Sequence, residues 1–171
     1  MSSKLMSAAI AVSVLADTFD GRWARLFKRD SHTREFGTQL DSLADAVTAG
    51  VVPVITLWAT VERPAGPFQL LLGIAGLAFL AAAVTRLGHF NIASGDDANF
   101  TGLPVPAAAL FVCTAILWPL DAMISSVVLF STAAAMVAPV RIPRPRGVGL
   151  AAFAAWAVVL ATLHLWRLGG S

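Results

Sequence analysis

The sequence predicts an all-α integral membrane protein, a polytopic bundle of about six transmembrane helices. Two observations carry this prediction. Of the 171 residues, 57% are hydrophobic and only 13% are charged, with a mean hydropathy of +0.76, whereas about 25% of residues in soluble domains are charged. The apolar residues also gather in stretches of the roughly 17–25 residues that a helix needs to cross a bilayer. An ordinary soluble domain is thereby excluded, and we expect no nucleic-acid partner.

Six apolar stretches justify the six predicted helices: 5–26, 38–61, 66–88, 103–119, 121–140 and 147–168. The break between the fourth and fifth is the shortest, but Pro119 and Asp121 favour two helices over one long one. The first sixteen residues carry no cleavage-site pattern, so we expect the first stretch to be retained. Because no soluble segment or repeat interrupts the series, residues 1–171 are predicted to form a single membrane domain.

The basic residues predict which loops face the cytoplasm, because Lys and Arg are enriched on that side. Three lie on one side of the predicted membrane: Lys4, Arg63 and Arg167. Nine lie on the other: Arg22, Arg25, Lys28, Arg29, Arg34, Arg86, Arg141, Arg144 and Arg146. The sequence therefore predicts a cytoplasmic-membrane protein with both termini outside the cytoplasm.

Several other residues are interpreted as structural. Cys113 lies in an apolar run, where a small buried side chain is expected. Gly73 and Gly76 form part of a small-residue face that indicates close helix packing, within the subunit or in a dimer. His164 is interpreted as an interfacial residue near the outer end of its helix, and His89 as a spectator near the cytoplasmic interface.

Four aspartates at the cytoplasmic ends of the first two stretches predict a metal site. Asp17 and Asp20 are three residues apart and Asp41 and Asp45 four, so each pair lies on one face of a helix. A carboxylate at membrane depth costs about 2.5–3.5 kcal/mol, so four cost on the order of 10 kcal/mol unless a cation compensates. Mg²⁺ is usually held by a few carboxylates and substrate phosphates. The two pairs suit one or two divalent cations with room for a pyrophosphate.

Small residues follow the first pair and indicate a phosphate site. Gly21 and Ala24 allow a nucleotide or phosphate to approach the backbone closely, and Arg25 suits a phosphate oxygen. Asp30 and Glu35, by contrast, are interpreted as solvated charges of the intervening loop. Arg86 and Asn91, at the predicted cytoplasmic end of the third helix, are interpreted either as interfacial residues or as contacts to an anionic group.

These residues carry a family resemblance. The stretch DTFDGRWAR at 17–25, followed by GTQLDSLAD at 37–45, resembles the signature of the CDP-alcohol phosphatidyltransferases, with every position of the eight-residue pattern filled. Within that family, residues 40–53, 86–91 and 100–108 are similar to phosphatidylserine synthases. The resemblance covers roughly residues 5–145.

The resemblance implies roles for the signature residues. Asp17, Asp20 and Asp41 would hold Mg²⁺ or Mn²⁺, two ions in all, with Asp45 contributing. Asp45 would also be the general base that deprotonates the serine hydroxyl, which then attacks the β-phosphorus of a CDP-linked lipid and expels CMP. The nucleotide site would be formed by these residues: Asp20, Gly21, Ala24, Arg25 and Gly37.

The implied reaction is the transfer of a phosphatidyl group from CDP-diacylglycerol, or its CDP-archaeol counterpart, to serine at a site that faces the cytoplasm. Arg86 or Asn91 would contact the serine carboxylate or the lipid phosphate. Alternatives are a different acceptor, such as glycerol phosphate or inositol phosphate, or an inactive membrane scaffold. A homodimer among membrane lipids is expected from the resemblance alone.

Two departures from the family pattern are expected to matter. Eleven residues separate Arg25 from Gly37, where the resemblance implies about eight, so a longer and more basic loop is expected. The family also has a helix before the one that carries the first aspartates, and only sixteen residues precede Asp17 here. We therefore expect that helix to be absent from these residues, either because the true start lies upstream of Met1 or because this is a shortened member of the family.

Overall fold

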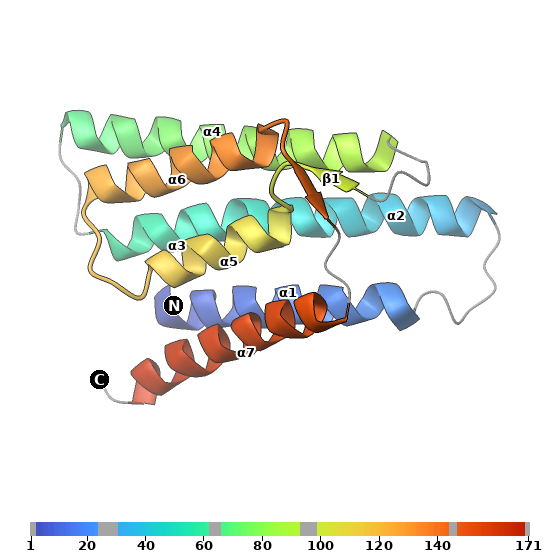
Figure 1. The fold of residues 1–171 in the computed structure, drawn as a ribbon. Helices are drawn as coiled ribbons and strands as arrows, with labels where there is room; N and C mark the ends of the chain where they lie inside the picture. Colours follow the sequence, from blue (N-terminus) through green and yellow to red (C-terminus); the bar gives the residue numbers. More distant parts are fainter. Residues whose placement is uncertain (1–2, 24–30, 62–65, 93–98, 144–146, 170–171) are drawn as a thin grey trace.

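In the part of the chain that the structure describes, six helical rods lie side by side and alternate in direction (Figure 1). The computed structural model describes residues 3–23, 31–61, 66–92, 99–143 and 147–169. The rods are α1 (Ser3–Trp23), the continuous helix α2–η2–α3, α4 (Pro67–Ile92), α5 (Val105–Ala115), α6 (Ala122–Val137) and α7 (Val148–Gly169). Within the second rod, α2 spans Ser31–Asp45, η2 spans Ala46–Val51 and α3 spans Val52–Thr60.

The rods form three layers, each of two neighbouring helices. In Figure 1, α4 and α6 form the upper layer, α3 and α5 the middle layer, and α1 and α7 the lower layer, and these pairs and their neighbours pack against one another. Both termini lie at one end of the bundle, the terminal end. At the opposite end, here called the aspartate end, α1 ends and α2 begins. The all-α helical bundle predicted from the sequence is confirmed.

The middle of the bundle is occupied by α5, which is apolar on every side. Its buried residues include Val105, Leu110, Val112 and Cys113, and together with Phe79 of α4 they belong to one continuous core. A helix that is hydrophobic all round is a buried helix. The prediction that Cys113 is a small buried side chain is confirmed, because it is fully buried and free.

Polar side chains of α7 hydrogen-bond to backbone carbonyls at the end of α5 and just beyond it. The last turn of α5 tightens, so that the Leu117 N–H donates to the Thr114 carbonyl at 3.1 Å, and the Cys113 carbonyl accepts from Nε2 of His164 at 3.1 Å. Arg167 donates to the Leu117 carbonyl. His164 is only 1% exposed, so its interpretation as an interfacial residue was wrong: an orphan helix carbonyl inside an apolar layer requires a donor.

The predicted helix boundaries need two corrections. The second rod begins at Ser31 rather than near residue 38, so most of the expected long loop after Arg25 is helical from that point. The added turns carry exposed polar side chains such as Thr33 and Glu35, which favour a helix that extends into water. The fourth helix is shorter than the predicted 103–119, because α5 spans only Val105–Ala115.

The predicted break between the fourth and fifth helices is confirmed. Residues 116–121 form a turn, and α6 then begins with Asp121 as its N-cap. The Ile124 N–H donates to Oδ1 of Asp121 at 2.7 Å, which satisfies one of the donors that every helix start leaves without a partner.

A short β-ladder ties two connections together at the aspartate end, and nothing in the sequence pattern predicts it. Strand β1 (Asn99–Thr101) pairs antiparallel with β2 (Arg141–Pro143). Gly102 continues the ladder, since its N–H donates to the Val140 carbonyl at 2.8 Å, and the Leu103 N–H donates to the Ala135 carbonyl at 2.9 Å. These bonds fix the start of α5 against the end of α6.

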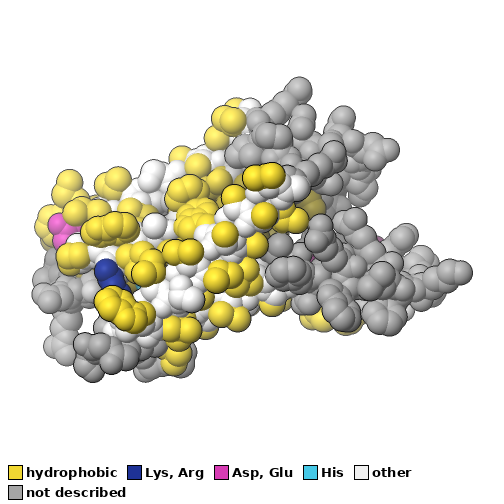
Figure 2. All heavy atoms as spheres, turned by 60° about the horizontal axis from the view of Figure 1, so that its bottom comes forward, with side chains coloured by type: hydrophobic (Ala, Val, Ile, Leu, Met, Phe, Trp, Pro, Cys, Tyr) yellow, Lys and Arg dark blue, Asp and Glu magenta, His cyan; other side chains and the backbone are white. Residues whose placement is uncertain are grey.

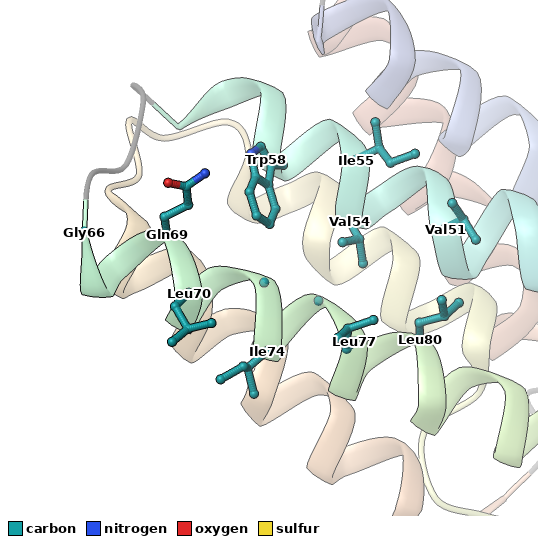
Figure 3. Close-up of a pocket in the computed structure, with 12 residues that line it drawn as sticks. Val51, Val54, Ile55, Trp58, Gly66, Gln69, Leu70, Ile74, Leu77 and Leu80 are labelled. Carbon is teal, nitrogen blue, oxygen red and sulfur yellow. The ribbon is translucent and has the colours of Figure 1, made fainter.

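The small-residue face predicted on the third helix packs within the subunit. A Cβ at Gly76 would lie 2.7 Å from Cγ1 of Val54, and one at Gly73 would lie 3.7 Å from the Trp58 ring. The glycines therefore allow α4 to approach α3. Beside this contact lies an open groove of about 610 Å³ with one polar side chain in its lining, Gln69 (Figure 3). The lining has no ionisable side chain, so this groove is not the predicted metal site.

The outer surface is apolar along most of its length. Figure 2 shows one face covered by hydrophobic side chains, with the coloured charged groups gathered at one end. Among the described residues, three helices are long and apolar enough to cross a membrane, over Glu35–Thr60, Pro67–Asn91 and Val148–Arg167, and three shorter apolar segments accompany them. These features support an integral membrane protein, and membrane crossing by the other three helices remains a prediction.

Candidate active site

The second aspartate pair lies on α2, close to its junction with η2. Asp41 is exposed and Asp45 is half-buried, one helical turn further into the bundle. Like charges four residues apart destabilise a helix by about 0.2–0.5 kcal/mol. A bound cation reverses that repulsion, so the arrangement fits the chemistry of a site for a hard divalent ion.

The rod changes its winding directly after Asp45. Residues 46–51 form the π-helix η2, whose i→i+5 bonds place an extra residue in the turn. The aspartates are thereby rotated about the rod axis relative to the side chains of α3. η2 packs against α1 and α4, and Gly50 allows the closest approach, because a Cβ there would lie 3.3 Å from Cδ1 of Leu80. Such π-turns are frequent at functional sites.

The first aspartate pair lies in the last two turns of α1, at the same end of the bundle. The backbone of Asp17, Asp20 and Gly21 is helical, and α1 packs against α3 and η2. The side chains of 17–23 lie outside the described part, as do Ala24 and Arg25 entirely. Gly37 is half-buried on α2. The helices thus bring the two halves of the signature to one end.

The described side chains do not by themselves form a metal cluster. No three His, Cys, Asp or Glu side chains among them gather closely enough to hold an ion. Two of the four predicted ligands, Asp17 and Asp20, do not belong to that set. Metal coordination by the four aspartates therefore stays a prediction, supported by the carboxylate pair on α2 and the position of the end of α1.

The end of α4 supplies the polar groups predicted for the acceptor. Arg86 is 9% exposed, so its side chain does not extend into the solvent as an interfacial residue would. A buried guanidinium favours a site for an anion, since it presents five donors in a fixed plane. Asn91 is half-buried in the last turn, and His89 is exposed. The roles of these residues remain predictions.

Ser42 was missed by the sequence analysis, although it lies between Asp41 and Asp45. Its Oγ lies 2.9 Å from Nδ2 and 3.1 Å from Oδ1 of Asn91, and 3.0 Å from the Thr38 carbonyl. The pair joins α2 to α4 across 49 residues of sequence. Its place within the signature was the available signal, but a serine on an aspartate-bearing helix reads equally well as solvated.

Comparison with known proteins agrees with this geometry. Residues 2–140 match the CDP-alcohol phosphatidyltransferase family, and the chain belongs to that family. It is 31% identical over 140 residues to an archaetidylserine synthase of Methanothermobacter thermautotrophicus, covering 81% of this chain and 58% of the relative.

Two relatives described as CDP-diacylglycerol–serine O-phosphatidyltransferases are also similar. The one from Helicobacter pylori is 36% identical over 110 residues, covering 63% of this chain and 44% of the relative. The one from Mycobacterium leprae is 36% identical over 118 residues, covering 64% and 36% respectively. The chain therefore spans between 36% and 58% of the length of these three relatives.

Proposed function

We propose that this protein transfers a phosphatidyl group from CDP-diacylglycerol, or the corresponding group from CDP-archaeol, to the hydroxyl of serine and releases CMP. The observation that carries the proposal is that both signature halves lie toward one end of the bundle (Figure 1): Asp17 and Asp20 belong to the last two turns of α1, and Asp41 and Asp45 lie one turn apart on α2 just before η2. The names of the relatives support serine as the acceptor.

In this mechanism Asp45 acts as the general base. Its carboxylate accepts the proton of the serine hydroxyl, the serine oxygen forms a bond to the β-phosphorus, and the bond from that phosphorus to the CMP oxygen breaks. Asp17, Asp20, Asp41 and Asp45 would hold Mg²⁺ or Mn²⁺, two ions in all, and these would supply neutralisation of the pyrophosphate and of the departing CMP.

The acceptor preference follows from the charges near the site. A phosphorylated alcohol needs several cations around its phosphate, and at the described end of α4 the permanent cation is Arg86. One guanidinium suits the single carboxylate of serine. The same site would face the cytoplasm, because nine of the twelve basic residues lie on the side of the predicted aspartate loops. In the membrane we expect a homodimer.

A CMP-release assay over a panel of alcohols tests the proposal. Purified protein in lipid nanodiscs receives CDP-diacylglycerol or CDP-archaeol, Mg²⁺ or Mn²⁺, and one of serine, glycerol phosphate, inositol phosphate or no alcohol. We expect CMP release with serine well above the alcohol-free rate. CMP release only with a phosphorylated alcohol would show that this alcohol, and not serine, is the acceptor. No CMP release with any of the alcohols would favour the inactive scaffold.

Replacing Asp17 tests the metal site independently of turnover. We expect Asp17→Ala to lose the metal-dependent part of its affinity for a CDP-lipid. The affinity should fall by on the order of 10–100-fold or more, because mutating even a residue that only hydrogen-bonds to a metal ligand has an effect of that size. The measurement is binding of labelled CDP-lipid with Mg²⁺ or with EDTA. Glu35→Ala, which removes an exposed carboxylate of α2, is the control and should bind normally. Equal binding by Asp17→Ala with and without metal would contradict the coordination scheme.

A further inference from the structure

The Ser42–Asn91 pair fixes the direction of an amide beside the predicted base. A serine hydroxyl carries a single hydrogen and accepts others through its oxygen. Two acceptors lie within reach of that hydrogen, the Thr38 carbonyl at 3.0 Å and Oδ1 of Asn91 at 3.1 Å, whereas Nδ2 of Asn91 can only donate to Oγ, at 2.9 Å.

Nδ2 of Asn91 donates to Oγ of Ser42, and the hydroxyl hydrogen is then donated either to Oδ1 of Asn91 or to the Thr38 carbonyl, so each arrangement has two hydrogen bonds. Donation to the preceding turn is common for serines in helices. An amide oxygen has two lone pairs, so in either arrangement Oδ1 of Asn91 keeps the capacity to accept a further hydrogen bond. The helical backbone of α2 thus sets the orientation of a side chain on α4.

The location gives this oriented oxygen a role. Ser42 lies three residues before Asp45, so both side chains occupy neighbouring positions on the same face of α2. Asn91 belongs to the last turn of α4, five residues after the buried cation Arg86. An amide oxygen held at this place suits an ammonium group, while the guanidinium suits a carboxylate, and an amino acid carries both.

We propose that Ser42 is a positioning residue that holds the Asn91 carboxamide with its oxygen toward the acceptor, so that Asn91 selects alcohols bearing an ammonium group. This inference rests on the proposed function and deepens it. Glycerol phosphate and inositol phosphate lack an ammonium and gain nothing from the amide oxygen. Serine and a hydroxy acid that has the carboxylate and hydroxyl but no ammonium group are distinguished by this contact alone.

The test is a set of variants compared by KM for serine, kcat, CDP-lipid affinity and thermal unfolding. We expect Ser42→Ala to raise KM for serine about three- to tenfold, the effect of one net hydrogen bond, with CDP-lipid affinity unchanged. Ser42→Thr keeps the hydroxyl and should restore most of the loss. Ser131→Ala is the matched control, because that exposed serine of α6 also donates to a helix carbonyl, that of Val127.

A double-mutant cycle tests whether the two residues act together. Asn91→Leu should raise KM for serine at least as much as Ser42→Ala, and the double variant should be no worse than Asn91→Leu alone, because the hydroxyl then has no amide to position. Asn91→Leu should also reduce the preference for serine over glycerate, which has a hydroxyl in place of the ammonium group. Additive increases in KM in the double variant would overturn the positioning role. So would a loss of CDP-lipid affinity as large as the increase in KM for serine.

The outcomes separate this inference from the proposed function. If the wild type releases CMP with serine but Ser42→Ala behaves like Ser131→Ala, the inference fails and the function stands. If the wild type neither releases CMP with serine nor binds radiolabelled serine, both fail. If Asn91→Leu keeps serine-dependent activity and its preference for serine over glycerate is unchanged, the ammonium contact is refuted and the proposed function stands.

Discussion

Asp45→Asn should reduce CMP release by about 10²–10⁴-fold, the usual contribution of a positioned general base, and leave CDP-lipid binding largely intact. The amide fills the same volume and offers an oxygen ligand, but it does not accept the proton of the attacking hydroxyl. The half-buried position of Asp45 at the junction of α2 and η2 keeps the substitution within the same packing. Single-turnover CMP release and equilibrium binding of the CDP-lipid measure the two effects separately.

Two further variants make that result specific. Asp41→Asn, one turn away and exposed, should weaken metal-dependent binding more than it slows the chemical step. Asp121→Asn makes the same chemical change at the terminal end, where Asp caps α6. Asn is an equally good N-cap, so this control should be neutral in all assays. Near-normal CMP release by Asp45→Asn would exclude it as the base.

Gly102→Ala should destabilise the protein by about 2–6 kcal/mol, through backbone strain and overpacking together. Gly102 has a φ of +78°, a conformation that disfavours L side chains. An added Cβ would also lie 2.1 Å from the Met136 carbonyl oxygen, and a backbone atom at the end of α6 does not rotate away. Thermal unfolding in detergent should show a loss on the order of 10 °C.

Gly147→Ala separates the effect of backbone strain from that of overpacking. Gly147 also has a positive φ, +53°, but no atom lies within 4 Å of the position its Cβ would take. It should therefore lose only the strain contribution, about 1–3 kcal/mol. If the two alanine variants unfold at the same temperature, a clash between the added Cβ and the end of α6 does not contribute to the effect of Gly102→Ala.

The sequence was sufficient for the features that depend on composition and local spacing. Apolar stretches predicted the six rods, Pro119 and Asp121 predicted the break between α5 and α6, and the aspartate spacing predicted pairs on single helix faces. The signature also predicted family membership, which the comparison confirmed. Each of these depends on residues that are close together in the chain.

What the sequence could not predict depends on partners far apart in the chain. The Ser42–Asn91 pair and the His164–Cys113 bond connect residues 49 and 51 positions apart, and the β-ladder joins two connections that carry no strand periodicity. His164 was misread because its neighbours in sequence are apolar and aromatic, as at an interface. Its actual environment is set by a carbonyl on another helix.

The short, central α5 has a consequence for how the chain enters the membrane. Its 11 residues extend about 16 Å, roughly half the hydrocarbon thickness. The Cys113 carbonyl in its last turn accepts from His164 of α7, and the Leu117 carbonyl just beyond it accepts from Arg167. During synthesis His164 is added 51 residues after Cys113. Until it arrives, α5 has bare polar groups that lipid does not satisfy. Insertion of α7, two helices later in the chain, therefore completes the hydrogen bonding at the end of α5.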